Sequence, residues 1–174
     1  MVKRGLIIGR FQPFHKGHLY VVKHVLEEVD EVVIVVGSAQ YSHRLDNPFT
    51  VGERLLMIRQ ALQEAQIPLS KCWLIPVPDL HVHMLWVSQV IGYTPKFQII
   101  YTNEPLTKRL FEEAGFNVKP IPFHKRKIYS ATEIRNRMLN GKNWKTLVPR
   151  AVARNIEKIS GVKRIQELAK TDKV

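Results

Sequence analysis

The chain is poor in cysteine, in acidic residues and in long apolar runs. Cys72 is the only cysteine among its 174 residues, so no disulfide can form within the chain. No apolar run approaches the roughly 20 residues that a membrane-spanning helix needs. The first apolar run ends at Arg10, too early for a secretory signal. From these absences we expect a cytoplasmic protein that does not bind membranes.

The shortage of acidic residues gives the chain a strong basic excess. It has 27 Lys and Arg residues against 15 Asp and Glu, for a formal net charge of +12 at pH 7. Such a charge favours partners that carry phosphate, which are nucleotides, nucleic acid or anionic surfaces. A solvated basic surface is the simpler alternative. The length and the apolar content of 45% fit one folded domain, which we expect to span residues 1–174.

The chain does contain a regular alternation of short apolar runs and stretches with the helical period. Val32 to Val36 is a continuous β-branched run, as in buried parallel strands, and Leu19 to Val29 repeats apolar residues at helical spacing. The expected strands are 6–8, 32–36, 73–77, 97–101 and 118–123. The expected helices are 19–29, 50–65, 85–91, 106–114, 130–139, 151–159 and 162–169. This order predicts an α/β fold: a doubly wound parallel sheet of about five strands, helices on both faces and a helical C-terminal extension from about 130.

Two helix starts carry the pattern of a capping box. Thr50 is followed three residues later by Glu53, and Ser130 by Glu133. Gly141 is well placed to end the second of these helices. In the first helix we expect a core-facing stripe made of Leu55, Ile58, Leu62 and Ala65.

The stretch GRFQPFHKGH, residues 9–18, leaves the carboxyl end of the first expected strand, where open α/β sheets bind ligands. A turn needs its prolines and glycine, but not the basic side chains that it also holds: Arg10, His15, Lys16 and His18. If a helix begins near Gly17, free backbone N–H groups point into this loop and attract anions. The stretch therefore predicts a phosphate-binding loop.

Two simpler interpretations of the histidines remain open. His15 and His18 have the H-x-x-H spacing of a metal pair, but no Cys, Asp or Glu lies near them, so we expect no metal site. Alternatively, the two histidines cap the helix and pack locally.

Two motifs resemble those of a known superfamily. H-x-G-H after the first strand resembles the first signature of the nucleotidyltransferases, and YSATEIR, residues 129–135, resembles their second, S-x-T-x-x-R. The stretches GSAQYSH, NPFTVGER, PD before LW, and LVP are similar to archaeal-type nicotinamide mononucleotide adenylyltransferases over almost the whole chain. That family makes NAD⁺ and pyrophosphate from ATP and nicotinamide mononucleotide. It has a Rossmann-like sheet, typically needs a divalent cation and commonly assembles as hexamers.

The resemblance implies a role for each matching residue of the loop. His15 and His18 would bind the ATP phosphates and the charge of the transition state, Arg135 would hold the β- and γ-phosphates, and Arg10 would bridge the reacting phosphates. These four are the implied catalytic residues. The implied ATP-binding residues are Gly9, Arg10, Phe11, His15, Lys16, Gly17, His18, Tyr129, Ser130, Thr132 and Arg135. A solvated helix arginine is the alternative for Arg135. Since neither motif holds a carboxylate, we expect Mg²⁺ to arrive with ATP.

The resemblance also implies a pocket for the acceptor. Its residues are Arg10, Gln12, Ser38, Phe49, Asp79, His83 and Trp86. Trp86 can stack on the pyridinium ring, although it also fits a buried helix face. His83 stands where the family commonly has asparagine, and it can hydrogen-bond a carboxamide or, when protonated, attract a nicotinate carboxylate. Asn103 and Glu104 also depart from the family and are placed to change contacts to the ribose or the metal.

Two further functions compete with this one. An adenylyltransferase for another phosphorylated acceptor, such as phosphopantetheine, fits the two motifs, but GSAQ, NPFT and Trp86 argue against it. The basic run Lys125–Lys127 and the net charge suggest a nucleic-acid-binding module, but basic residues are not interleaved with aromatic ones. We therefore expect ATP and nicotinamide mononucleotide as partners, no nucleic acid and no membrane, and a homo-oligomer, with the hexamer as the family's form.

Overall fold

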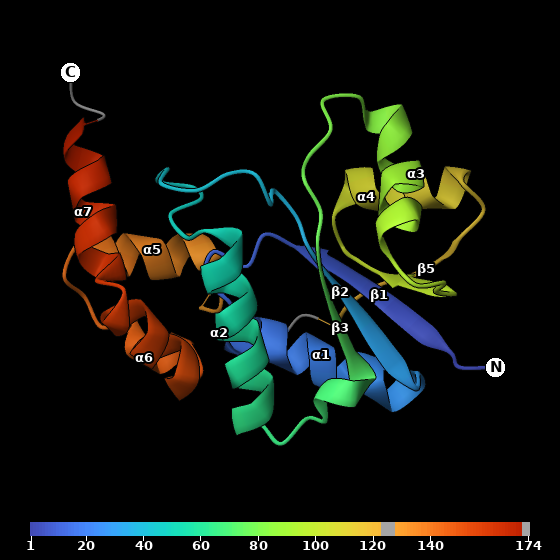
Figure 1. Cartoon of the computed structure of the whole chain (residues 1–174), viewed down its shortest axis with the longest axis horizontal. Coiled ribbons are helices and arrows are strands. Elements are labelled where there is room, and N and C mark those ends of the chain that lie inside the picture. Colours follow the sequence, from blue (N-terminus) through green and yellow to red (C-terminus); the bar gives the residue numbers. More distant parts are fainter. Residues whose placement is uncertain (123–127, 172–174) are drawn as a thin grey trace. The chain divides into compact units, whose positions relative to one another are not determined.

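A computed structural model of the chain describes residues 1–122 and 128–171. Its sheet has five strands, and every neighbouring pair is parallel. The strands are β1 (Arg4–Gly9), β2 (Glu31–Val36), β3 (Cys72–Pro76), β4 (Ile99–Tyr101) and β5 (Asn117–Lys119). Their order is β3-β2-β1-β4-β5, so the direction of winding reverses between β1 and β4 (Figure 1). The predicted α/β fold with a parallel sheet is confirmed. Phe123, the expected end of the last strand, lies outside the described residues.

The described helices follow the predicted order. They are α1 (Lys16–Glu28), α2 (Val51–Glu64), α3 (His83–Tyr93), α4 (Pro105–Glu113), α5 (Ala131–Leu139), α6 (Arg150–Lys158) and α7 (Gly161–Thr171). Short 3₁₀ turns lie at Leu69–Lys71 and Lys145–Leu147. Gly141 adopts a positive φ of 65° just after α5, as expected for a residue that ends a helix. None of the helices in the described part has the length and hydropathy of a membrane span.

The contacts divide the chain into two compact units. The sheet unit comprises Met1–Gly9, Val21–Ala39 and Pro68–Pro122, and the helical unit comprises Arg10–Tyr20, Gln40–Ile67 and Phe123–Val174. The sheet unit holds all five strands with α3 and α4, and the helical unit holds α2 and α5 to α7. The helix α1 gives its first residues to the helical unit and the rest to the sheet unit. The single domain expected from the sequence stays a prediction.

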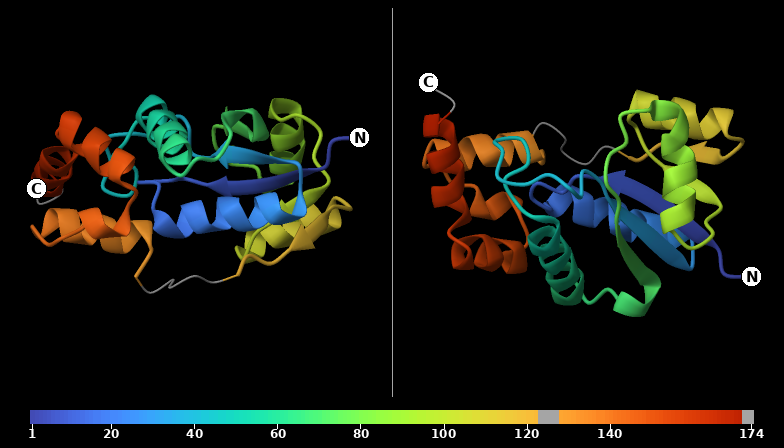
Figure 2. Two further views of the ribbon diagram at one scale, coloured as in Figure 1. Left: turned by 90° about the horizontal axis from the view of Figure 1, so that it is seen from below. Right: turned by 45° about the horizontal axis from the view of Figure 1, so that its top comes forward.

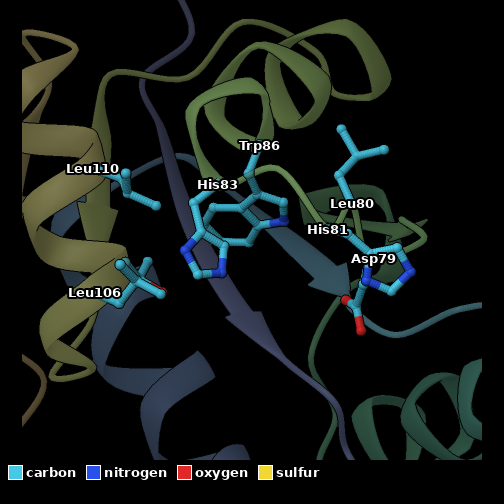
Figure 3. Close-up of a pocket in the computed structure, with 8 residues that line it drawn as sticks. Asp79, Leu80, His81, His83, Trp86, Leu106 and Leu110 are labelled. Carbon is cyan, nitrogen blue, oxygen red and sulfur yellow. The ribbon is translucent and has the colours of Figure 1, made fainter.

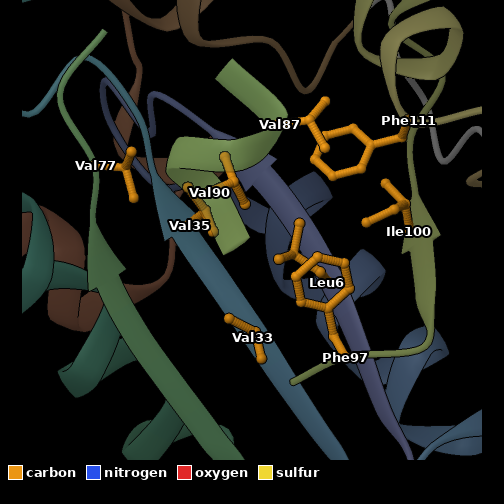
Figure 4. Packing of buried hydrophobic residues seen from close by; sticks show 9 residues of the cluster. All are labelled: Leu6, Val33, Val35, Val77, Val87, Val90, Phe97, Ile100 and Phe111. Atoms are coloured by element: carbon orange, nitrogen blue, oxygen red, sulfur yellow. The ribbon is translucent and has the colours of Figure 1, made fainter. Parts of the chain in front are cut away.

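The core of the sheet unit lies between the sheet and the pair α3 and α4. Leu6, Val33 and Ile100 point from the strands toward these helices (Figure 4). The residues that meet them include Val87 and Val90 of α3 and Phe111 of α4. On the opposite face, a Cβ built on Gly5 would lie 2.9 Å from Val25 of α1 and 2.7 Å from the Tyr101 ring. Helices therefore cover both faces of the sheet, and the glycine lets α1 approach closely.

The helical unit is held by helix pairs and by ion pairs, one of which joins α7 to α2. α2 packs against α6, and both α5 and α6 pack against α7 (Figure 2). The capping box at Thr50 is confirmed: its hydroxyl accepts from the Glu53 N–H at 3.2 Å, and the Glu53 carboxylate accepts from the Thr50 N–H at 2.9 Å. Arg164 of α7 binds both oxygens of that carboxylate, at 2.7 and 2.8 Å. The start of α2 is thus fixed from two sides.

Two local predictions are wrong in part. The buried stripe of α2 consists of Arg54, Met57, Ile58, Ala61 and Leu62, whereas Leu55 and Ala65 are only half-buried. The stripe is rotated because an arginine occupies an interior position, which hydrophobic spacing does not anticipate. At the second expected capping box, the Ser130 hydroxyl does accept from the Glu133 N–H, at 3.1 Å. The Ser130 N–H donates instead to the Ile128 carbonyl, and Glu133 pairs with Arg137 at 2.7 Å.

Candidate functional site

The two motifs that the sequence singled out meet inside the helical unit. α1 begins at Lys16, so Gly17 lies in its first turn, as the sequence predicts. A Cβ built on Gly17 would lie 3.0 Å from the Cβ of Tyr129 and 3.1 Å from the His15 ring. Neither neighbour is the free end of a flexible side chain. Glycine therefore lets the loop approach the segment that leads into α5 without a shift of either neighbour.

His15 and His18 bind each other's backbone. The His15 N–H donates to Nδ1 of His18 at 3.2 Å, and the His18 N–H donates to Nδ1 of His15 at 3.3 Å. The two rings are stacked, with centroids 3.5 Å apart and planes 19° from parallel. A nitrogen that accepts a hydrogen bond carries no proton, so each neutral ring keeps its proton on Nε2. Both histidines thus offer an Nε2–H donor. The hydrogen bond from the His18 N–H to the His15 ring also agrees with the alternative that the histidines cap the helix.

The environment keeps this histidine pair neutral. Burial lowers the pKa of His15 from its ordinary value to about 4. Burial also lowers the pKa of His18, and the proximity of His15 lowers it further. Both rings are therefore uncharged donors near neutral pH. Within residues 1–122 and 128–171, no three His, Cys, Asp or Glu side chains cluster so that they could hold a metal ion.

Two arginines lie close together at the same loop. Nη1 of Arg135 donates to the Gln12 carbonyl at 2.8 Å, and Nη1 of Arg10 donates to the Asp46 carboxylate at 3.3 Å. Burial lowers the pKa of Arg135, and the positive charge of Arg10 lowers it further, while Asp46 opposes both effects. Two cations held near each other create a positive potential that suits an anion. By contrast, Arg137 pairs with Glu133, so only Arg135 is turned toward the loop.

The remaining loop residues mostly hold the structure of the unit. Gln12 is 1% exposed, and its side-chain amide forms two hydrogen bonds of 2.9 Å with the backbone N–H and C=O of Phe49. The Phe49 side chain is fully buried. Both residues were expected at the acceptor, but in this structure their side chains are interior. Lys16 is exposed, and Ser130 caps α5.

A second group of expected residues lies in the sheet unit, at the carboxyl ends of neighbouring strands. Ser38 follows β2, and Asp79 follows β3. The Asp79 carboxylate accepts from the Ser38 N–H at 3.0 Å and from the Ser38 hydroxyl at 2.7 Å. At the end of β1, the Gly9 carbonyl accepts from the Gly37 N–H at 2.9 Å. Gly9, Ser38 and Asp79 therefore lie along one edge of the sheet.

A pocket of about 360 Å³ lies beside Asp79 in the same unit (Figure 3). It is lined by Asp79, Leu80, His81, His83, Trp86, Leu106, Thr107 and Leu110. Trp86 is half-buried: its ring lines the pocket and also meets Phe111 of the core edge-on, at 5.6 Å and 78°. Both interpretations of Trp86, stacking surface and core residue, fit this position. His83 is exposed and is the first residue of α3.

Asn103 and Glu104, the two residues after β4 that depart from the family, form hydrogen bonds with the backbone of nearby segments. The Asn103 amide forms hydrogen bonds of 2.6 and 3.0 Å with the C=O and N–H of Ile121. The Glu104 carboxylate caps α4 by accepting from the N–H groups of Leu106, at 3.2 Å, and Thr107, at 2.6 Å. The structure therefore gives each of them a local role.

Sequence reasoning missed several residues of these groups. Arg54 is fully buried, and its Nη1 donates to the Arg10 carbonyl at 2.8 Å. Asp46 pairs with Arg10, and His81 lines the pocket. The sequence held one signal that Arg54 is unusual. It lies in the first turn of a helix, where acidic residues are favoured. The basic run Lys125–Lys127 lies outside the described residues.

Comparisons with known proteins agree with the resemblance. Residues 6–137 match the cytidylyltransferase-like family. A nicotinamide-nucleotide adenylyltransferase of Ignicoccus hospitalis is 54% identical over 97% of this chain and 99% of the relative. One from Picrophilus torridus is 51% identical over 97% of this chain and 99% of the relative.

The fold also matches a solved structure. A bifunctional NMN adenylyltransferase/ADP ribose pyrophosphatase from Francisella tularensis, complexed with AMP and a Mn ion, superposes with a TM-score of 0.76 at 25% identity. The match covers 97% of this chain and 52% of that one, so this chain spans about half of that protein.

Proposed function

Because the chain belongs to the cytidylyltransferase-like family, we infer that it transfers the adenylyl group of ATP to nicotinamide mononucleotide, forming NAD and pyrophosphate. Relatives with about half of their residues identical over nearly the full length carry this activity in their names. The observation in the structure that best supports the inference is that the loop with the neutral histidine pair also carries Arg10 and accepts a hydrogen bond from Arg135, since these groups are donors suited to phosphate oxygens.

The reaction needs no nucleophilic side chain. A phosphate oxygen of the mononucleotide forms a bond to the α-phosphorus of ATP, and the bond from that phosphorus to the bridging oxygen breaks, leaving its electrons on pyrophosphate. Both reactants are anions, so the barrier consists largely of repulsion, alignment and charge on the leaving group. Burial raises the pKa of Cys72 to about 11, which keeps this thiol protonated and unreactive.

The loop of the helical unit is the proposed site for the ATP phosphates. The Nε2–H groups of His15 and His18 would donate to phosphate oxygens without adding positive charge to the free enzyme. Arg135 would hold the β- and γ-phosphates, and Arg10 would bridge the reacting phosphates. Lys16 is a proposed helper. The proposed backbone and second-motif contacts of this unit come from Phe11, Gly17, Tyr129, Ser130 and Thr132. Gly9, which the resemblance also implies, is the last residue of β1 in the sheet unit.

The pocket of the sheet unit is the proposed site for the acceptor's base. The exposed face of Trp86 would stack on the positively charged pyridinium ring. His83 would face the ring substituent, and the Ser38–Asp79 pair would supply polar contacts. Gln12 and Phe49, which the resemblance also implies at the acceptor, belong to the helical unit, where their side chains are buried.

We propose that the divalent cation enters as part of the substrate, bound to ATP as Mg²⁺. The described residues present no ligand cluster for a resident ion, and both histidine Nδ1 atoms already accept hydrogen bonds. An ion that keeps most of its waters and binds phosphate oxygens fits this set of donors.

A pyrophosphate-release assay with a panel of acceptors tests the proposed function. Purified protein is mixed with Mg-ATP and nicotinamide mononucleotide, nicotinate mononucleotide, phosphopantetheine or no acceptor. We expect pyrophosphate with nicotinamide mononucleotide, in a one-to-one ratio with NAD, and background release without an acceptor. Faster turnover with phosphopantetheine, or no release with either mononucleotide, would overturn the proposal.

A further inference from the structure

Arg54 is a buried cation that its own helix does not explain. It is 0% exposed and lies in the first turn of α2, where the helix dipole disfavours positive charge. Burial of a guanidinium is also costly unless its donors are well used. A leucine or methionine would fill the same interior position without either cost. The contacts of the guanidinium must therefore be what favours arginine here.

The hydrogen bonds of the Arg54 guanidinium reach the loop of residues 10–18, the phosphate loop. Nη1 of Arg54 donates to the Arg10 carbonyl at 2.8 Å, and Nε donates to the Thr50 carbonyl at 3.4 Å. Two residues further along the loop, Nη1 of Arg135 donates to the Gln12 carbonyl, also at 2.8 Å. Two guanidinium groups, one from α2 and one from α5, thus hold the carbonyls on either side of Phe11.

Phe11 has an unfavourable backbone conformation. Its φ is +52°, in the left-handed region that a residue with a bulky side chain rarely adopts. Such a conformation persists only where surrounding contacts enforce it. The hydrogen bond from Arg54 fixes the peptide group that precedes Phe11. The hydrogen bond from Arg135 fixes the Gln12–Pro13 peptide group, one step beyond the peptide group that follows Phe11.

The enforced turn places the Phe11 ring against the histidine pair. Phe11 is 3% exposed, and its ring meets the His18 ring edge-on, with centroids 4.8 Å apart. His18 in turn stacks on His15. The contacts therefore run from Arg54 through the Arg10 carbonyl and the Phe11 ring to the histidine rings.

We propose that Arg54 is a positioning residue that holds the Arg10–Phe11 segment in its strained conformation and thereby fixes the direction of the His18 ring. Its action on turnover rests on the proposed function, whereas its action on the loop does not. Arg54 itself is buried and acts only through other residues.

The kinetic test compares Arg54→Met and Arg54→Lys with Arg59→Met, an exposed arginine on the same helix. We expect kcat of Arg54→Met to fall about 10- to 100-fold, because a displacement of about 1 Å costs up to about 10²-fold in rate. KM for ATP should change less than about threefold. Lysine keeps the charge but lacks the planar set of donors, so Arg54→Lys should lose about tenfold. Arg59→Met should match the wild type.

An NMR titration of the His15 ring separates positioning from general stability. If Arg54 holds the loop, the pKa of His15 should rise in folded Arg54→Met from about 4 toward 6.5. An unchanged titration with unchanged kcat overturns the proposal, and so does a lower melting temperature with an unchanged titration. If the methionine variant does not fold, Arg54→Lys decides by the same two measurements. Should the wild type fail to use nicotinamide mononucleotide, the titration still reports on the loop.

Discussion

The helical unit and the sheet unit present their candidate functional side chains in opposite states. In the helical unit, His15 is 6% exposed, its ring is stacked on His18 and each Nδ1 accepts a backbone N–H. In the sheet unit, His81 and His83 are exposed and line an open pocket together with leucines and half-buried Trp86. The histidine pair is thus held in one arrangement by its hydrogen bonds, whereas the pocket residues border an open space in which a ligand can bind.

This difference between fixed and exposed side chains fits two tasks of the proposed reaction, stabilisation of the transition state and recognition of the acceptor. Donors fixed before the substrate arrives stabilise charge in the transition state, because no reorganisation is needed at the moment of reaction. An open pocket with an indole face and imidazoles distinguishes acceptors by ring shape and substituent. We therefore expect substitutions in the phosphate loop to change the rate, and substitutions in the pocket to change the choice and affinity of the acceptor.

The largest effect is expected for His18→Ala. Loss of one fixed donor to a developing charge typically lowers the rate by ~10²–10³. Steady-state kinetics with saturating Mg-ATP and mononucleotide measure kcat. His24→Ala is the control, because His24 lies on the same helix but pairs with Glu27 and Glu28. Near-normal turnover of His18→Ala would reduce the pair to a structural role.

The next effect concerns stability in acid. Below pH 6.5 an unfolded chain protonates His15, while the folded ring stays neutral until pH about 4. The unfolded state thus binds more protons in this window, so the free energy of unfolding should fall as the pH falls, by up to about 3 kcal/mol. Urea unfolding at several values between pH 7 and pH 4 measures it. His15→Asn should show a shallower dependence, and equal slopes would refute the neutral, buried state of this ring.

A smaller effect is expected for Trp86→Leu. Removal of the indole face should raise KM for nicotinamide mononucleotide several-fold, since a cation–π contact is worth about 0.5–2 kcal/mol. KM for ATP should stay within about twofold. Trp73→Leu, on the exposed side of β3, serves as the control. If both tryptophan variants behave alike, Trp86 is only a core residue.

The smallest effect is expected for His83→Asn. An imidazole and a carboxamide place their hydrogen-bond donors and acceptors differently, so this substitution should change how the pocket distinguishes the two ring substituents. The preference for nicotinate over nicotinamide mononucleotide should therefore shift by a small factor in His83→Asn. The ratio of the two kcat/KM values measures this preference. His81→Asn shows whether the neighbouring ring contributes. Equal ratios in wild type and His83→Asn would exclude a contact between His83 and the substituent.

The sequence predicted the elements well because their signals are local. The β-branched run Val32 to Val36 lies within β2, as expected. The capping box of Thr50 and Glu53 forms with both of its hydrogen bonds. The two motifs also pointed to residues that the structure brings together, since Gly17 lies against Tyr129 and Arg135 against the loop.

What the sequence could not predict depends on contacts between distant residues. Gln12 was expected at the acceptor, but its side-chain amide is hydrogen-bonded to the backbone of Phe49, 37 residues away. Arg54 reads as a surface arginine, although it is buried beneath the Arg10 carbonyl. The positive φ of Phe11 has no local signal, because only tertiary contacts make it tolerable for a bulky residue.

The most direct test of this division of tasks is the Kd of nicotinamide mononucleotide for His18→Ala, measured by isothermal titration calorimetry. If the phosphate loop acts on the transition state and the pocket binds the acceptor, Kd should stay within about threefold of the wild type while kcat falls by ~10²–10³. A loss of mononucleotide affinity as large as the loss of kcat would contradict the account, because it would make His18 a binding residue for the acceptor.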